Sequence, residues 1–480
     1  MIALLLLVGE ALARAGGGEG FGGGSRSSGG GGGSYGGGGG GDGLGLLLWL
    51  VFNHPVIGVP VVIVVVVVVI AQKRNAGGGR EVYRSHPAEL RPARRGVDTS
   101  FLLPFDANFS LPLFLDLARL VYVRAHEERG RRNWDALRPF VTPGVITSLE
   151  KRGPVREVRE VIIGSAGLSG ASLEGDAALL TVQFQANYTE VAADGTQQWL
   201  VHERWSFRRT AATSSPGPDR MRALACPNCG NPSETRADGS CTRCDTVIND
   251  GRLQWQVTAA SLTDRSPLPR IALGPGSGVE AGTRLPTRTA ADLGVQMRRF
   301  TARHADFQWP DFRSRAEESF RRVQAAWSAR DAQALRPLET DFLYQQHRYW
   351  LERYAREGLR NHVDDVRVTE VVPVKLTLDA WLEAFTVRIY ASVLDWTEDK
   401  SGKVVGGSRD GARQFSEYWT FIRSTGSTSN ATDLDHCPSC GAPLDRVSET
   451  GVCGYCEAKV TGGDFDWVLA TIDQDEAYSG

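Results

Sequence analysis

The sequence predicts an α+β protein built from two tandem copies of one domain, and three observations lead to this fold class. Short phrases recur in the same order: WDALRPFVT at 134–142 corresponds to AQALRPLET at 332–340, and HERWSFRR at 202–209 corresponds to SEYWTFIR at 416–423. In each copy a region of helical periodicity comes first, and a region of alternating apolar residues follows it. Each copy also carries one cluster of four cysteines. Helices followed by antiparallel strands are typical of α+β domains, here with one curved sheet around a helical layer.

The spacing of apolar residues predicts the elements of each copy. Intervals of three or four predict one amphipathic helix at the start of each copy, through Phe114, Leu117, Val121 and Ala125, and through Ala316, Phe320, Val323 and Trp327. The ALRP phrase predicts a short second helix, and a charged third helix follows it. Alternation then predicts strands through Val182, Phe184, Ala186 and Tyr188, through Phe385, Val387, Ile389, Ala391 and Val393, and around Trp205, Phe207, Trp419 and Phe421. The segments that flank the cysteine clusters complete each sheet.

Domain boundaries follow from these patterns and from shifts in composition. We expect domain one at 101–262 with its cysteine insertion at 222–252, a linker rich in Pro, Gly and Arg at 263–300, and domain two at 301–473 with its insertion at 434–464. An insertion between two antiparallel strands is tolerated because the strand ends remain neighbours.

The first 71 residues predict targeting and membrane attachment. Residues 1–15 combine an apolar run with Ala13-Arg14-Ala15, the small-residue pattern of a signal-peptidase site, although a misassigned start within a longer signal is an alternative. Residues 16–43 are Gly-rich and predict a flexible, disordered spacer. Residues 44–71 form an apolar stretch that exceeds the roughly 20 residues needed for one helical crossing. They predict a transmembrane helix, with a buried core segment as the alternative.

Basic residues after this stretch set its predicted orientation. The linker 72–100 carries three acids against Lys73, Arg74, Arg80, Arg84, Arg91, Arg94 and Arg95. The positive-inside rule therefore predicts a single-pass protein of the inner membrane, with both domains in the cytoplasm. The same linker would attract anionic lipid headgroups at about 1 kcal/mol per basic residue near the surface, or it serves only as a topology signal.

All eight cysteines lie in two clusters of one pattern, namely Cys226, Cys229, Cys241 and Cys244, and Cys437, Cys440, Cys453 and Cys456. Two C-x2-C pairs separated by eleven or twelve residues have the spacing of a zinc ribbon. Each short gap lets a tight turn present two sulfurs to one ion. Four thiolates around tetrahedral zinc leave no open position for water, so the pattern predicts two structural zinc ions, one per ribbon.

Other uses of the cysteines are less consistent with the pattern. Thioredoxin-like redox chemistry needs one C-x-x-C at a helix start, whereas these motifs occur in pairs. Disulfides would need an oxidising compartment, which the predicted cytoplasmic location disfavours. Iron could replace zinc in a four-thiolate site.

Charge argues against a nucleic-acid partner. The whole chain is nearly balanced, with 54 basic and 56 acidic residues. The second ribbon carries seven acids between 433 and 466 against Arg446 and Lys459, and such a surface would repel phosphates. A protein partner, or simple stapling of a long hairpin, fits the ribbons better.

The order of the N-terminal features resembles bacterial members of the Tim44-like family, named for a subunit of the mitochondrial inner-membrane import translocase. These features are a signal-like start, the phrase ARAGGGEGFGGG and one predicted membrane span. The phrases FSLPLFLDLARLVYVRAHEERGRRNWDALRPFVTPGVITSLE and FRRVQAAWSARDAQALRPLETDFLYQQHRYWLE resemble the opening helices of the family's domain. The resemblance covers residues 100–210 and 305–425.

This resemblance implies a cone-shaped α+β fold, similar to nuclear transport factor two, for each copy. It also implies an adaptor at the membrane face that touches lipid and chaperone or translocon partners. The chain departs from the mitochondrial pattern by its two copies, by a cysteine insertion in each, and by lacking an evident chaperone-binding segment. The import function is therefore not carried over.

The functional prediction is a membrane-anchored, non-enzymatic binding or adaptor protein with two zinc-stapled domains, active in translocation or membrane-protein handling. The alternatives are a small-ligand sensor or an enzyme that uses the cone cavity of the same fold. His202 and Asp395 lie on predicted strands and could point into such cavities, but no paired acid and base occur at a defined spacing. No P-loop or H-E-x-x-H motif occurs in the sequence.

Overall fold

A computed structural model describes Ala15 and residues 96–480, apart from positions 233, 237, 272, 274–277 and 428–432. These described residues belong to one compact unit. The predicted signal peptide before Ala15, the spacer 16–43 and the apolar stretch 44–71 lie outside them, as does most of the basic linker. Within the described part of the chain, no helix is long and apolar enough to cross a membrane.

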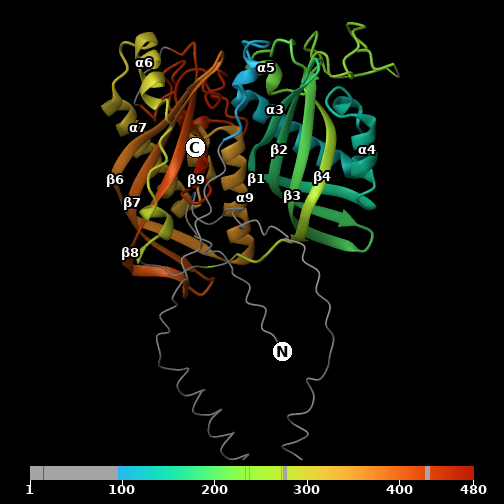
Figure 1. Ribbon diagram of the computed structural model, residues 1–480. Helices are drawn as coiled ribbons and strands as arrows, with labels where there is room; N and C mark the ends of the chain where they lie inside the picture. Colours follow the sequence, from blue (N-terminus) through green and yellow to red (C-terminus); the bar gives the residue numbers. More distant parts are fainter. Residues whose placement is uncertain are drawn as a thin grey trace, which may run out of the picture. The chain divides into compact units, whose positions relative to one another are not determined.

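The first half places its long helix and the two helices after it before its strands, as predicted, and the short α5 lies between β3 and β4 (Figure 1). Its helices are η1 (Ser100–Leu102), α3 (Leu111–Arg131), η2 (Asp135–Leu137), α4 (Pro143–Glu150) and α5 (Pro218–Met221). Its strands are β1 (Val155–Glu174), β2 (Ala177–Ala192), β3 (Gly195–Thr210) and β4 (Gln256–Pro267), which form one antiparallel sheet in the order β1-β2-β3-β4. The apolar face of α3 packs against this sheet and forms the core with it.

The second half repeats the order of a long helix, shorter helices and then antiparallel strands, and it adds β5, η3 and α6 before the long helix. Its helices are η3 (Ala281–Arg284), α6 (Leu293–Arg303), α7 (Trp309–Ala329), α8 (Ala332–Leu335), η4 (Arg336–Leu338), α9 (Asp341–Glu357) and η5 (Leu444–Arg446). Its strands are β5 (Gly278–Val279), β6 (Arg360–Leu378), β7 (Leu382–Glu398), β8 (Val404–Ser424) and β9 (Val468–Gln474). The sheet order is β5-β8-β7-β6, and β9 also pairs with β8. Strand β5 is parallel to β8, and the other pairs are antiparallel.

The segment that the sequence predicts as a linker, residues 263–300, contains regular structure. It holds the end of β4, all of β5 and η3, and most of α6. Strand β5 reaches the second sheet because Gly278 and Val279 pair with Arg413 and Gln414 of β8. Two residues of strand are too short to produce the alternation that reveals a strand in a sequence.

The long helices α3 and α7 end in the same way. Each has 21 residues, and each stops at an arginine in the left-handed conformation, Arg132 at φ 56° and Arg330 at φ 58°. A left-handed residue at the C-terminus turns the chain sharply away from the helix axis. Helix α3 begins at Ser110, whose hydroxyl accepts the backbone N–H of Leu113 at 3.4 Å.

Bulges curve both sheets around their helices. In β1 the register shifts between Arg159 and Ile162, and Glu160 has φ 52°. In β6 the register shifts between Asp364 and Arg367, and Asp365 has φ 49°. An extra residue with positive φ bends a strand and increases its twist, so each first strand can wrap over its long helix.

Candidate functional site

Each cysteine cluster lies on the connection between two adjacent antiparallel strands, as the sequence predicts. The first cluster connects β3 to β4, and the second connects β8 to β9. Each leading cysteine closes its own turn through the backbone. The N–H of Cys226 donates to the carbonyl of Asn231 at 2.7 Å, and that of Cys437 donates to Ala442 at 2.7 Å. These turns orient both sulfurs of a C-x2-C pair to one point.

The four Sγ atoms of each cluster lie within 4.8 Å of one another. The Sγ atoms of Cys226 and Cys244 are 3.8 Å apart, those of Cys229 and Cys241 are 4.0 Å apart, and the second cluster has the same two distances. Sulfurs about 2.3 Å from a tetrahedral zinc ion would be about 3.8 Å from one another. A disulfide would need about 2.05 Å. Both clusters are therefore geometrically compatible with zinc.

Electrostatics also favours a cation at each cluster. Burial raises the pKa of the Cys226 thiol and of the Cys437 thiol to about 12. Hydrogen bonds lower the pKa of two other thiols, that of Cys244 to about 6 through the Asn228 side chain and that of Cys456 to about 7 through the Ala458 N–H. A buried thiolate is unfavourable without a neighbouring positive charge. A bound divalent ion would supply that charge and allow all four thiols to ionise.

The second ribbon is held tightly to the helices of its own half. Four side chains of its helices donate hydrogen bonds to the ribbon. Arg322 of α7 contacts the Asp435 carboxylate at 2.7 and 3.1 Å, and Gln333 of α8 donates to the Val447 carbonyl at 2.6 Å. Arg336 of η4 donates to the Glu449 carbonyl at 2.9 Å, and Arg348 of α9 donates to the Glu449 carboxylate at 2.9 Å. Lys459 of the ribbon adds an ion pair to Asp341 at 2.6 Å. The ribbon and the helical layer therefore form one packed body.

The first ribbon contacts the ends of β3 and β4, where the N–H of Thr210 donates to the Gly251 carbonyl at 3.0 Å and Gln256 Nε2 donates to the Asn249 carbonyl at 2.8 Å. Its contacts with helix α5 are longer. The Nη1 atom of Arg220 in α5 lies 3.4 Å from the carbonyls of Pro227 and of Asn228. Within the ribbon, Arg236 pairs with Asp245 at 2.5 Å, and about half of the Arg236 side chain stays exposed, at 46%. The first ribbon is therefore bound less closely to α5 than the second ribbon is to α7, η4 and α9.

The acidity of the second ribbon serves contacts within the chain. Asp435 pairs with Arg322 and Glu449 with Arg348, while the buried Asp466 pairs with Arg315 at 2.8 Å. These carboxylates are neutralised by arginines of the same half. The sequence shows an excess of acidic residues in this ribbon, which argues against phosphate binding. The structure shows that arginines on the helices neutralise part of this negative charge.

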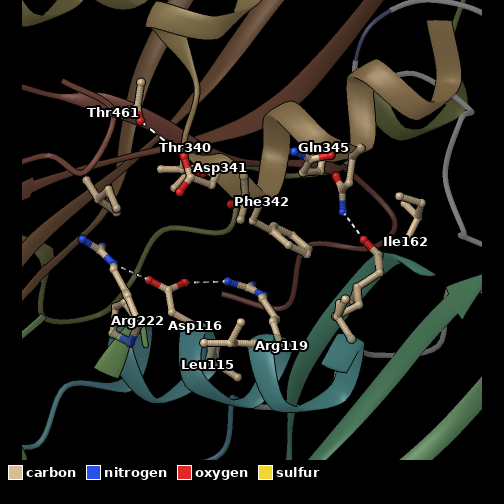
Figure 2. A pocket seen from close by; sticks show the side chains of 18 of the residues that line it. Leu115, Asp116, Arg119, Ile162, Arg222, Thr340, Asp341, Phe342, Gln345 and Thr461 are labelled. Carbon is tan, nitrogen blue, oxygen red and sulfur yellow. Dashed lines mark hydrogen bonds and ion pairs between the residues drawn. The ribbon is translucent and has the colours of Figure 1, made fainter. Parts of the chain in front are cut away.

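A pocket of about 800 Å³ lies between α3 of the first half and α9 of the second half (Figure 2). Most of its wall is apolar and comes from both halves, including Leu111, Leu115, Leu120, Val123, Val161, Ile163, Phe342, Ile422 and Ala470. Such a wall suits an apolar ligand or an apolar side chain of a partner.

Charged groups gather at one side of this pocket. Asp116 lies between two arginines, with Arg119 Nη1 at 3.2 Å and Arg222 Nε at 3.0 Å (Figure 2). The Arg119 guanidinium stands 4.0 Å from the ring centroid of Phe342, and Arg222 Nη1 lies 3.2 Å from the Gly462 carbonyl. The pocket therefore combines an apolar floor with an ion-paired rim.

One titratable group lies close to this rim. Burial raises the pKa of the Asp473 carboxyl to about 6, against the opposing charge of Arg119. Burial also lowers the pKa of the Arg119 guanidinium, which its ion pair with Asp116 counters. Burial therefore shifts the pKa of one group from each half beside this rim, Arg119 of the first half and Asp473 of the second.

His202 and Asp395, the two strand residues that could have faced a cavity, do not meet. His202 lies on β3 and its Nδ1 is 3.6 Å from Asp264 Oδ2. Asp395 lies on β7 of the other sheet, where it is buried and accepts a hydrogen bond from Asn361 Nδ2 at 2.8 Å. Neither residue lines the pocket.

Comparison with known families gives one match. Residues 293–433 match the Tim44-like domain, a stretch that runs from the start of α6 to just before the second cysteine cluster. The mixed α+β architecture with curled sheets agrees with that match. Comparison with curated proteins gives no match. The Tim44-like domain indicates a membrane-associated adaptor or binding role, and domains of this family bind protein partners.

The rim residues of the pocket carry no signal in the sequence. Asp116, Arg119 and Arg222 read as ordinary charged residues, and Phe342 opens an amphipathic helix. They meet because α3 and α9, more than 200 residues apart along the chain, lie on the two sides of one pocket. Predicting these rim residues would have required knowing which helices pack against each other, and the spacing of residues in the sequence does not give that.

Proposed function

We propose that this chain is a membrane-attached, non-enzymatic adaptor that presents two zinc-stapled Tim44-like domains to a protein partner. The family match over 293–433 carries the proposal. The apolar stretch 44–71 would attach the chain, and the residues after 72 would lie on the cytoplasmic side of the inner membrane.

The proposal treats the first half as a second copy of the Tim44-like domain. Helices α3 and α7 have equal length and the same left-handed cap, and the bulges at Glu160 and Asp365 fall at corresponding places. Arg209 stacks over Trp255 at 4.5 Å, and Arg423 stacks over Trp467 at 4.6 Å. Independent origins would have to reproduce each of these details.

The proposed metal is zinc, with one structural ion in each cluster. Purified full-length protein should contain about two equivalents of zinc per chain, as four-thiolate sites of this spacing hold one ion each. Cys229→Ser and Cys440→Ser should each reduce the content to about one equivalent. Atomic emission on the purified protein measures zinc and iron together. A wild-type content below two metal equivalents, or iron in place of zinc, would contradict this part of the proposal.

The partner surface is proposed to include the first ribbon, because its hydrogen bonds to helix α5, at 3.4 Å, are longer than those of the second ribbon to α7, α8, η4 and α9. A photo-crosslinking residue at Arg243, which is exposed on this ribbon, should capture a protein from intact membranes. The matched position in the second ribbon is Tyr455, with 48% exposure. Equal capture from both positions would mean that the first ribbon has no special role. Capture from neither would argue against an adaptor function of the ribbons.

Anionic lipid is a second proposed contact, through the basic residues between 73 and 95. Full-length protein in vesicles with anionic lipid should be cut by trypsin at these residues more slowly than in zwitterionic vesicles. The protection should disappear at high salt, because screening weakens surface attraction. Equal cutting in both vesicles would show that the segment acts only as a topology signal.

The pocket between α3 and α9 supports a second candidate function, the binding of an apolar ligand. Its apolar wall and volume of about 800 Å³ are the observation that favours it. An apolar fluorescent probe should bind to the wild-type protein, and Leu115→Trp should reduce binding by filling the pocket. The control is Leu103→Trp, because Leu103 is 48% exposed and lies outside the pocket. Undiminished binding to Leu115→Trp would exclude this pocket as the site.

A further inference from the structure

Ala15 lies inside the core of the second half. It has 0% exposure and belongs to the apolar cluster formed by α7 and its sheet. Its carbonyl oxygen accepts a hydrogen bond from Gln324 Nε2 at 3.1 Å, and Gln324 of α7 is itself fully buried. The Oε1 atom of Gln324 has no hydrogen-bond partner within the described part of the chain. Burying the Gln324 amide without a partner would be unfavourable, so this hydrogen bond favours the position of Ala15.

The first half fills the corresponding space with its own side chains. His126 occupies the place of Gln324, since each lies six residues before the left-handed cap of its helix. The His126 ring stacks on Tyr188 at 4.8 Å and lies 4.5 Å from Tyr122, tilted by 52°, while Tyr122 stacks on Phe184 at 4.4 Å. This aromatic stack closes the interior of the first half.

The second half has smaller side chains at these places. Phe184 of the first half corresponds to Ile389 of the second. Phe184 pairs across the sheet with Glu203, and Ile389 pairs with Glu417, and each glutamate lies two residues before a tryptophan. Four residues further on, Tyr188 of the first half corresponds to Val393 of the second. Replacing two aromatic rings by aliphatic side chains leaves room, and an empty space of that size in a core is unfavourable.

We propose that the interior of the second half is a peptide-binding cavity and that its occupant is the N-terminal segment of the same chain at Ala15. The site selects small residues, because a side chain larger than a methyl group would meet the surrounding core at this fully buried position. The sequence around Ala15 agrees with such selection, since Gly16, Gly17 and Gly18 follow it. Recognition comes from the main-chain carbonyl through Gln324.

This inference goes beyond the proposed adaptor function and changes two expectations about the N-terminus. Cleavage by signal peptidase after Ala15 would remove the occupant from the chain, so the docked segment requires that residues 1–15 are retained. A single crossing by residues 44–71 would also separate Ala15 from residues 96–480 by a membrane. Docking requires both to lie on the same side.

The full-length protein in detergent provides the test, because trypsin has two sites near this segment. Arg14–Ala15 borders the docked residue, and Arg26–Ser27 lies in the Gly-rich stretch. We expect Arg14–Ala15 to be cut about tenfold more slowly than Arg26–Ser27 in the folded protein, and at a similar rate in urea. Mass spectrometry of the released peptides gives both rates, and the intact mass shows whether residues 1–15 are present.

Variants then identify the contact. Gln324→Leu keeps the side-chain volume but removes the donor, so cutting at Arg14 should accelerate about two- to tenfold. Ala15→Leu should accelerate it further, because the larger side chain no longer fits. Gln296→Leu, on the partly exposed face of α6, is the matched control and should change nothing. Thermal unfolding followed by circular dichroism checks that each variant is folded.

Two results would overturn the inference: equal cutting at Arg14 and Arg26 in the folded wild-type protein, or a mature chain that starts at Gly16. Neither result depends on the zinc content or on the crosslinked partner. The proposed adaptor function would therefore stand or fall separately.

Discussion

A buried polar network replaces part of the apolar core in the first half. Glu203 is fully buried, and its Oε1 lies 3.1 Å from His126 Nε2 and 2.8 Å from Arg152 Nη1. Trp205 Nε1 donates to Glu203 Oε2 at 2.8 Å. Burial opposes ionisation of Glu203, but the His126 ring and the Arg152 guanidinium hold its pKa below the usual range. Burial lowers the pKa of the His126 imidazole to about 4, so the ring is neutral beside an ionised glutamate.

His126 should therefore make the stability of the protein depend on pH. Its pKa is 6.5 in the unfolded chain and about 4 in the folded state, so between these values the unfolded state binds more protons. The free energy of unfolding should fall as the pH is lowered from 6.5 to 4, by at most about 3 kcal/mol. His126→Gln should remove this fall, as measured by urea unfolding at several pH values.

The control for this experiment is His436→Gln, because His436 is exposed on the second ribbon. Its unfolding free energy should follow the wild-type curve. If the unfolding free energy of His126→Gln fell between pH 6.5 and 4 as steeply as that of the wild type, the prediction that His126 is buried in its neutral form would be wrong.

At the scale of elements, the two ribbons differ in how they are attached although their sulfur geometry is the same. Arginines of α7, η4 and α9 hold the second ribbon, and the closest is Arg322, which contacts Asp435 at 2.7 Å. The first ribbon contacts the short α5 through Arg220 at 3.4 Å, and it contacts the ends of β3 and β4 through the carbonyls of Gly251 at 3.0 Å and Asn249 at 2.8 Å. Local order in the second ribbon is therefore coupled to the helical layer of its half.

Loss of the second metal site should consequently destabilise the protein more than loss of the first. Cys440→Ser should lower the melting temperature further than Cys229→Ser, by about 2–4 °C for each kcal/mol of lost ribbon-to-helix contact. Differential scanning calorimetry of the two variants gives the comparison. The same decrease in both would show that the ribbon contacts on α7 and α9 contribute little stability.

For the whole molecule, the main question is what joins its two halves. The Gln346 side chain of α9 donates to the carbonyls of Ile163 at 2.5 Å and Gly164 at 3.0 Å in β1. Trp381 Nε1 donates to the Asn108 carbonyl at 3.0 Å. With the contact between Arg119 and Phe342, these bonds tie the second half to the first around the pocket.

Breaking this junction should uncouple the halves. Phe342→Glu removes the ring under Arg119 and places a carboxylate in the apolar pocket, at a cost of about 1–3 kcal/mol. A single unfolding transition of the wild-type protein should then split into two. Phe105→Glu is the control, because Phe105 is 50% exposed, and it should unfold like the wild type. Unchanged cooperativity in Phe342→Glu would mean that the pocket does not join the halves.

Local patterns in the sequence predict most of the elements. The apolar residues of α3 and α7 recur at helical spacing, and those of β2 and β7 alternate, because each element buries one face. The two cysteine clusters are also predictable, since a C-x2-C turn presents two sulfurs whatever surrounds it. The short strand β5 and the helix α6 were not predicted, because the segment that holds them reads as a linker.

By itself, the sequence therefore determined the α+β class, the order of the long helices and of the long strands that follow them, and the eight thiols. The tertiary structure alone decided the pocket rim of Asp116, Arg119 and Arg222, and the burial of Ala15 against Gln324. The physical reason is distance along the chain. Periodicity and ligand spacing act over a few residues, whereas these contacts join surfaces that become neighbours only when the helices and sheets pack.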